Sequence, residues 1–130
     1  MKHVLILIAI ALLAVVLPSA KGASPLQFAE NSYDFGTVAD SHDPIVHEFH
    51  FVNTSSEPVA ILSVQTGCGC TKPEYPIKPV AAGAEGVIKI TFLPKGQRGD
   101  INKNINVRYR SSSEKSSKRI TLRLRGHVTK

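Results

Sequence analysis

Two cysteines with one residue between them are the first candidates for chemistry in this chain. Cys68 and Cys70 are its only cysteines and stand in the stretch TGCGCTKP. Thiols this close could form a structural disulfide, exchange electrons with another thiol, or clamp a soft metal ion such as Cu(I). They could also be two small, partly buried side chains that are linked because their compartment is oxidising.

The spacing of the two cysteines argues against a strong structural staple. A disulfide between residues two apart closes almost no loop, so it restricts the unfolded chain very little. In a straight strand, Cα atoms two residues apart lie about 6.6–6.8 Å from each other, which is the upper limit for a disulfide. Gly69 could let the backbone bend, and a strained bond of this kind would be easy to reduce. A passive disulfide, a redox pair and a Cu(I) clamp therefore all stay open.

Neither zinc nor a strongly activated thiol is indicated by the residues around the motif. Zinc would need two further ligands, and no histidine of the chain has a ligand-like spacing to the cysteines. Lys72 is the only base close to them in sequence, and no helix N-terminus is expected there. We expect no cofactor, and the alternative is copper bound by Cys68 and Cys70.

The N-terminal segment has the composition of a secretory signal peptide. A short basic start precedes an unbroken apolar run from Val4 to Leu17, and a small-x-small cleavage site follows in PSAKGAS. We therefore expect a signal peptide over residues 1–22 and one mature domain over residues 23–130. The run is short for a membrane span, which needs about 20 residues, although retention as an anchor is the alternative. The expected protein is exported, periplasmic or secreted, and has no transmembrane span in its mature chain.

The mature segment consists of short alternating stretches separated by turns. Apolar and polar residues alternate in IVHEFHFVN, GVIKITF, INKNINVRY and RITLRLRGHV, which is typical of strands with one buried face. About seven such strands, with turn signals at near-regular intervals, predict an all-β fold, an immunoglobulin-like antiparallel β-sandwich. In VAILSVQT the adjacent Ile61 and Leu62 break the alternation, which predicts a β-bulge.

Four short motifs of the chain together resemble those of a known family. Asp34-Phe35-Gly36 comes first, and the others are an H-x-F-x-F-x-N strand (47–53), C-G-C-T (68–71) and a proline-rich segment with a small-Gly turn (79–83). With the late strand pair they cover nearly the whole mature chain. They resemble a family of exported bacterial domains catalogued as domain of unknown function 1573. The resemblance implies an immunoglobulin-like fold similar to domains of the Hydin and major-sperm-protein type.

Basic residues are concentrated in the second half of the chain. Residues 23–71 contain six acids and no Lys or Arg, whereas residues 72–130 contain fourteen bases and four acids. In the last two predicted strands the outward positions carry a basic ribbon: Arg108, Arg110, Arg119, Arg123 and Arg125. Such residues often only keep a sheet edge soluble, but they could also contact an envelope protein or an anionic envelope polymer. Nucleic acid is not an expected partner, because the chain is exported and no aromatic residues are interleaved with the bases.

No catalytic constellation is visible in the sequence. The G-x-S-x-G, H-E-x-x-H and phosphate-loop motifs are absent. His47 and His50 point to opposite faces of a predicted strand, so we expect a hydrogen-bonded, half-buried His47 and no chelating pair. The expected function is that of a non-enzymatic, exported module that acts by protein or envelope contact. The alternative is a periplasmic Cys68–Cys70 site for Cu(I) binding or thiol–disulfide exchange.

Overall fold

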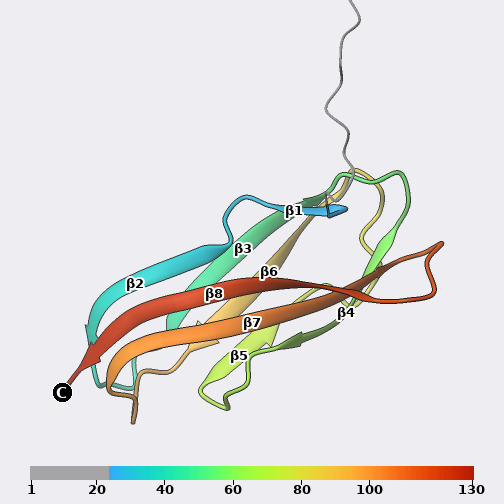
Figure 1. Ribbon diagram of the computed structural model, residues 1–130. Helices are drawn as coiled ribbons and strands as arrows, with labels where there is room; N and C mark the ends of the chain where they lie inside the picture. The colour runs from blue at the N-terminus through green and yellow to red at the C-terminus, as the bar shows by residue number, and fades with distance from the viewer. Residues whose placement is uncertain (1–23) are drawn as a thin grey trace, which may run out of the picture.

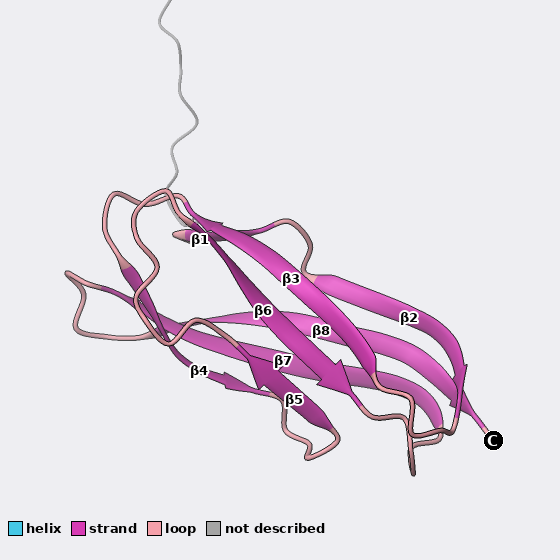
Figure 2. Ribbon diagram, turned by 180° about the vertical axis from the view of Figure 1, so that it is seen from behind, coloured by secondary structure: helices cyan, strands magenta, loops and turns pink. Residues whose placement is uncertain are grey.

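A computed structural model describes residues 24–130, and the predicted signal peptide lies outside this range. Eight strands follow one another in it: β1 (Leu26–Phe28), β2 (Ser32–Ala39), β3 (Ile45–Asn53), β4 (Val59–Gln65), β5 (Thr71–Glu74), β6 (Glu85–Phe92), β7 (Gly99–Ser111) and β8 (Lys118–Thr129). They form two four-stranded sheets. We call β2-β8-β7-β4 the front sheet and β1-β3-β6-β5 the back sheet, from their places in Figure 1; Figure 2 gives the view from behind.

The predicted immunoglobulin-like sandwich is confirmed, with eight strands where about seven were expected. The N-terminal stretch is divided between the sheets, because β1 pairs with β3 and β2 pairs with β8. β2 runs parallel to β8, the one exception to antiparallel pairing among the described strands. Residues 29–31 carry the chain from one sheet to the other, so β2 joins the front sheet beside the final strand. No helix among residues 24–130 has the length and apolarity needed to cross a membrane.

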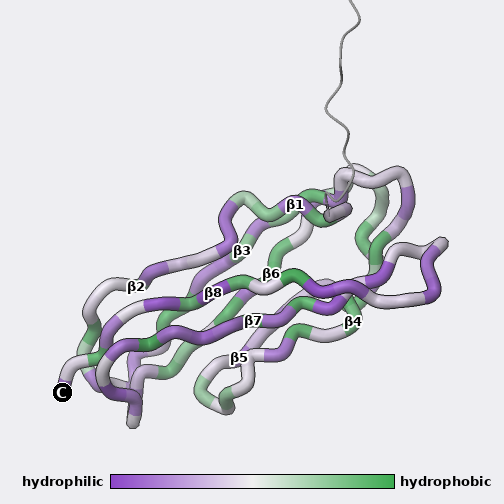
Figure 3. Tube along the Cα trace, viewed as in Figure 1, coloured by the Kyte–Doolittle hydropathy of each residue, from purple (hydrophilic) through white to green (hydrophobic). Residues whose placement is uncertain are grey.

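The core lies between the sheets and consists of the inward side chains of alternate residues. The alternation is visible along β7 and β8 in Figure 3. In β8, Leu122 and Leu124 are buried, whereas Arg123 and Arg125 are exposed. Full burial of one large apolar side chain contributes about 1.5–3 kcal/mol. A shift of register by one residue would expose the whole set, so this pattern fixes the register of the strand.

Each sheet has one glycine that an aromatic ring covers from the core side. Gly86 faces the ring of Phe51, its partner across β3 and β6, and a Cβ there would overlap the ring. Gly126 in β8 faces the ring of Phe35 in β2, with the same consequence. Both positions therefore require glycine, because any side chain would overlap the ring. In this way each sheet packs an aromatic ring directly against the backbone of a strand.

Asn53, the last residue of β3, is a fully buried polar residue that ties two loops to the back sheet. Its side-chain nitrogen Nδ2 donates to the carbonyl oxygens of Glu57, Val80 and Ala81 at 2.9–3.2 Å. Its Oδ1 accepts from the amide and the hydroxyl of Ser55 at 3.0 and 2.7 Å. This network uses both ends of the buried Asn53 amide, so the polar group is satisfied within the core.

The bulge predicted in the fourth strand is confirmed. The register of β4 against β7 shifts between Ile61 and Ser63, and Leu62 is exposed at the shift. The extra residue turns Leu62 outward, so Ile61 and Val64 can both face the core.

Candidate functional site

The Cys-Gly-Cys motif forms the corner at which the chain passes from the front sheet to the back sheet. β4 ends at Gln65 on the edge of one sheet, and β5 begins at Thr71 on the edge of the other. Cys68 and Cys70 are joined there by a disulfide, and their Cα atoms are 5.3 Å apart. This loop lies at the lower edge of the sandwich in Figure 1, away from the tip of the β7–β8 hairpin. The cysteines come closer than in a straight strand because they lie in a turn between two strands.

Hydrogen bonds anchor the backbone of this corner independently of the disulfide. The Thr66 hydroxyl lies 3.2 Å from the carbonyl oxygen of Cys68 and 3.0 Å from that of Thr71. The carbonyl of Cys70 accepts from the amide of Leu93, just after β6, at 2.9 Å. Gly67 has a φ of 71°, a left-handed conformation that favours glycine. The corner is thus attached to the back sheet through its main chain.

The two sulfur atoms have different surroundings. The Cys70 amide donates to Sγ of Cys68 at 3.1 Å, whereas Sγ of Cys70 lies 3.6 Å from the Thr71 hydroxyl. Both cysteines are half-buried, and Cys70 packs against the core. No group of three or more His, Cys, Asp or Glu side chains able to hold a metal ion occurs among residues 24–130. The role of the pair stays a prediction.

All five predicted contact arginines are exposed on the outer surface of the front sheet. We call this surface the arginine face: Arg108, Arg110, Arg119, Arg123 and Arg125. Strand pairing places Arg108 directly opposite Arg119 across β7 and β8. The other two arginines of β8 lie opposite asparagines of β7. The hairpin therefore combines two successive strands into one basic surface.

None of these arginines forms an ion pair with a carboxylate in the part of the chain that the structure describes. The ion pairs found there all involve a lysine or a histidine. Like charges directly opposite each other across two strands are destabilising. The pair Arg108 and Arg119 therefore leaves a repulsion that an anion bound from outside would relieve.

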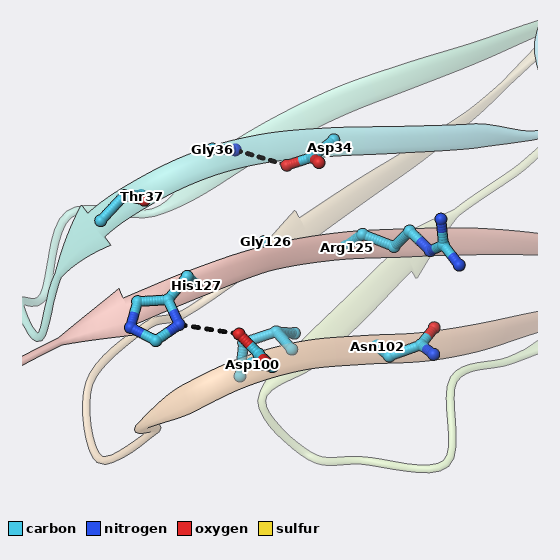
Figure 4. A pocket seen from close by; sticks show the side chains of 9 residues that line it. Asp34, Gly36, Thr37, Asp100, Asn102, Arg125, Gly126 and His127 are labelled. Carbon is cyan, nitrogen blue, oxygen red and sulfur yellow. Dashed lines mark hydrogen bonds and ion pairs between the residues drawn. The ribbon is translucent and has the colours of Figure 1, made fainter.

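Acidic side chains border the arginine face at one end, where a shallow hollow lies between β2, β8 and β7 (Figure 4). His127 Nδ1 lies 2.8 Å from Oδ1 of Asp100, and Oδ1 of Asp34 accepts from the Gly36 amide at 2.8 Å. Arg125 is the strand partner of Asp34, but its side chain extends away from His127 in Figure 4. Both aspartates are engaged by other groups, and Arg125 remains without a carboxylate partner.

The two histidines of β3 lie as predicted. His47 is half-buried, contacts the carboxylate of Glu30 and stacks on Tyr33 with ring centroids 3.8 Å apart. His50 is exposed on the opposite side of the strand. The pair therefore does not chelate, and His47 helps to join β2 to β3.

Sequence reasoning missed one residue beside the arginines. Arg108 Nη2 donates to the Ser117 hydroxyl at 2.9 Å. The hairpin tip reads SSSEKSSK, and serines are ordinary turn residues, so nothing in the sequence distinguishes Ser117 from the other four. The hydrogen bond from Arg108 singles it out.

Comparison with solved structures places the fold among PapD-like and major-sperm-protein-type domains. The ASH/PapD-like domain 7 of human CEP192 has a TM-score of 0.67 at 18% identity, with 82% of this chain and 86% of that chain covered. The YadV chaperone has a TM-score of 0.60 at 12% identity, and the alignment covers 81% of this chain but about half, 52%, of the chaperone. WR4, a C. elegans MSP family member, has a TM-score of 0.56 at 12% identity, with 82% and 99% covered.

Comparison at the level of sequence gives one result. The family model described as "Protein of unknown function (DUF1573)" matches residues 26–128. None of the curated proteins compared matches the chain.

Proposed function

This chain belongs to the DUF1573 family, and on that premise we propose that it is an exported, non-catalytic immunoglobulin-like module whose arginine face binds an anionic partner of the cell envelope. The partner is an acidic envelope protein or an anionic envelope polymer. The observation that carries the proposal is the set of five exposed arginines without a carboxylate partner among the described residues.

The chemistry of arginine supports binding rather than mere solubility. A guanidinium group has five N–H donors in a planar fork that matches the geometry of carboxylate and phosphate groups. It is also more weakly hydrated than an ammonium group, so it loses less on binding. Several such groups of one sign on one face create a potential that attracts anionic partners. A contact role also agrees with the chaperone activity stated in the name of YadV.

Charge reversal on the arginine face tests this proposal. The variant Arg119→Glu, Arg123→Glu, Arg125→Glu should lose most of its attachment to envelope fractions, because attraction becomes repulsion. The control variant Lys72→Glu, Lys78→Glu, Lys95→Glu changes exposed lysines outside this face and alters the net charge by the same amount. It should stay attached. Equal attachment of the two variants, with both folded by circular dichroism, contradicts the proposal.

We propose thiol–disulfide exchange or Cu(I) binding at Cys68 and Cys70 as a second candidate function. The observation that favours it is the amide of Cys70, which donates to Sγ of Cys68. When a partner dithiol reduces the bond, the partner is oxidised to a disulfide, and Cys68 and Cys70 become thiols. The amide of Cys70 is a donor from which a thiolate at this position can accept a hydrogen bond. The reduced pair could bind Cu(I) through two thiolates.

The two versions of this second candidate have separate tests. The reduction potential of the pair should lie close to that of the exporting compartment if the pair exchanges, and far below it if the bond is passive. The reduced protein should bind Cu(I) anaerobically, and the variant Cys68→Ser, Cys70→Ser should not. Unchanged Cu(I) binding by that variant removes the copper version.

A further inference from the structure

A second, smaller hollow lies on the arginine face beside the tip of the β7–β8 hairpin. It has a volume of about 220 Å³ and is lined by Arg108, Ser117, Lys118 and Arg119. The tip is at the right of Figure 1. The hollow of Figure 4, which contains acidic and basic side chains, lies at the opposite end of the paired strands β7 and β8. No aspartate or glutamate lines it.

The hydrogen-bond donors of this hollow are partly held in place. The half-buried Ser117 accepts the bond from Arg108, which orients the guanidinium group. A hydroxyl can accept and donate at the same time, so the O–H of Ser117 can still serve an acceptor in the hollow. Arg119 enters from the opposite strand as the direct partner of Arg108.

The charge of the hollow comes mainly from the two guanidinium groups. Lys118 lies 3.7 Å from the carboxylate of Glu114, which offsets its charge. Two guanidinium forks and a hydroxyl offer more donors than the two oxygens of a carboxylate can use. A terminal phosphate has three acceptor oxygens and a charge of about −1.5 to −2 near neutral pH, which matches both the donors and the charge.

We propose that the hollow between Arg108 and Arg119 binds a phosphate monoester group. The inference goes beyond the proposed function, since it assigns to this hollow a phosphate ligand of its own in addition to the envelope partner of the arginine face. The same chemistry is offered by the headgroup of phosphatidic acid and by a soluble phosphate compound. Bound phosphate would also remove the repulsion between the two arginines.

Thermal unfolding of the full chain in sodium phosphate, against sodium chloride of the same ionic strength, tests the site. A ligand that binds only the folded state raises the unfolding midpoint, and for a domain of this size a well-occupied site should raise it by about 4 to 8 °C. The variant Arg108→Gln, Arg119→Gln should lose this rise. The matched control Lys72→Gln, Lys78→Gln removes the same charge from exposed lysines outside the arginine face and should keep it.

Vesicles then distinguish the two sources of phosphate. Co-sedimentation with vesicles that contain phosphatidic acid, lost in Arg108→Gln, Arg119→Gln and kept in the control, supports a lipid headgroup. A phosphate-dependent rise in the midpoint without vesicle binding supports a soluble phosphate compound. The site is overturned if phosphate does not raise the unfolding midpoint, or if it raises the midpoint equally in both double variants. If charge reversal still abolishes envelope attachment in that case, this inference fails and the proposed function stands.

Discussion

The outer surfaces of the two sheets differ although their inner surfaces follow one plan. On the back sheet, Lys89 pairs with Glu74 at 3.6 Å and lies directly opposite Glu48 across β3 and β6, so its positive charge is set between two carboxylates. On the front sheet, the arginine face has no such pairing among the described residues. The back sheet compensates its charge internally, whereas the front sheet leaves its charge for a group from outside.

Stability does not explain this difference. Ion pairs on an exposed surface typically contribute about 0–1 kcal/mol, so the pairs of the back sheet add little and their absence from the front sheet costs little. The interior is alike in both sheets, since each buries alternate apolar residues and covers one glycine with an aromatic ring. The comparison therefore separates residues that specify the fold from residues that can serve a partner.

The largest effect should come from a buried polar residue of the interior. Asn53→Ala removes the donors to three carbonyls and the acceptor for Ser55, and should lower the free energy of unfolding by about 3 kcal/mol or more. Denaturant unfolding followed by circular dichroism measures the loss. A loss below about 1 kcal/mol would show that water replaces the network.

Added methyl groups test whether the two sheets are equivalent inside. Gly86→Ala and Gly126→Ala each force a Cβ into an aromatic ring and should each cost about 1–3 kcal/mol. Gly69→Ala is the control, because a Cβ there meets no atom within 4 Å, and it should change stability by less than about 0.5 kcal/mol. A large loss at one of the two covered glycines and none at the other would break the equivalence.

Removal of the disulfide tests the corner that joins the sheets. Cys68→Ser, Cys70→Ser should lower the free energy of unfolding by about 1.5 kcal/mol at most, because the closed loop is so short. Thr66→Val in the same background should add to the loss, since its hydroxyl contacts two carbonyls of the corner. If the cysteine variant unfolds outright, the disulfide and not the hydrogen bonds holds the corner.

The smallest changes in the free energy of unfolding are expected from single substitutions on the two outer surfaces, and they should have opposite signs. Arg119→Gln relieves the repulsion from Arg108 and should stabilise the protein by about 0.2–1 kcal/mol in the absence of phosphate. Lys89→Gln breaks a surface ion pair and should destabilise it by a similar amount. Both differences should shrink at high salt, which screens exposed charges. Equal signs would mean that the two surfaces do not differ as proposed.

Local patterns in the sequence were sufficient for much of the fold. Alternation predicted the long strands, the broken alternation at Ile61 and Leu62 predicted the bulge, and parity placed His47 and His50 on opposite faces. Outward parity also placed all five arginines on the surface. These features depend on neighbours along one strand, where side chains must alternate between core and solvent.

Features that join distant segments needed the tertiary structure. The sequence predicted antiparallel strands, but the parallel pairing of β2 with β8 depends on how the chain crosses between the sheets. Polar alternation likewise cannot say which residue lies opposite Arg108, because register is set by how two strands meet. The sequence by itself thus determined an all-β domain with a basic late hairpin and a closely spaced cysteine pair. The tertiary structure decided that the cysteines form a corner between sheets, and that Arg108, Arg119 and Ser117 converge, because both depend on contacts between segments that the chain folds together.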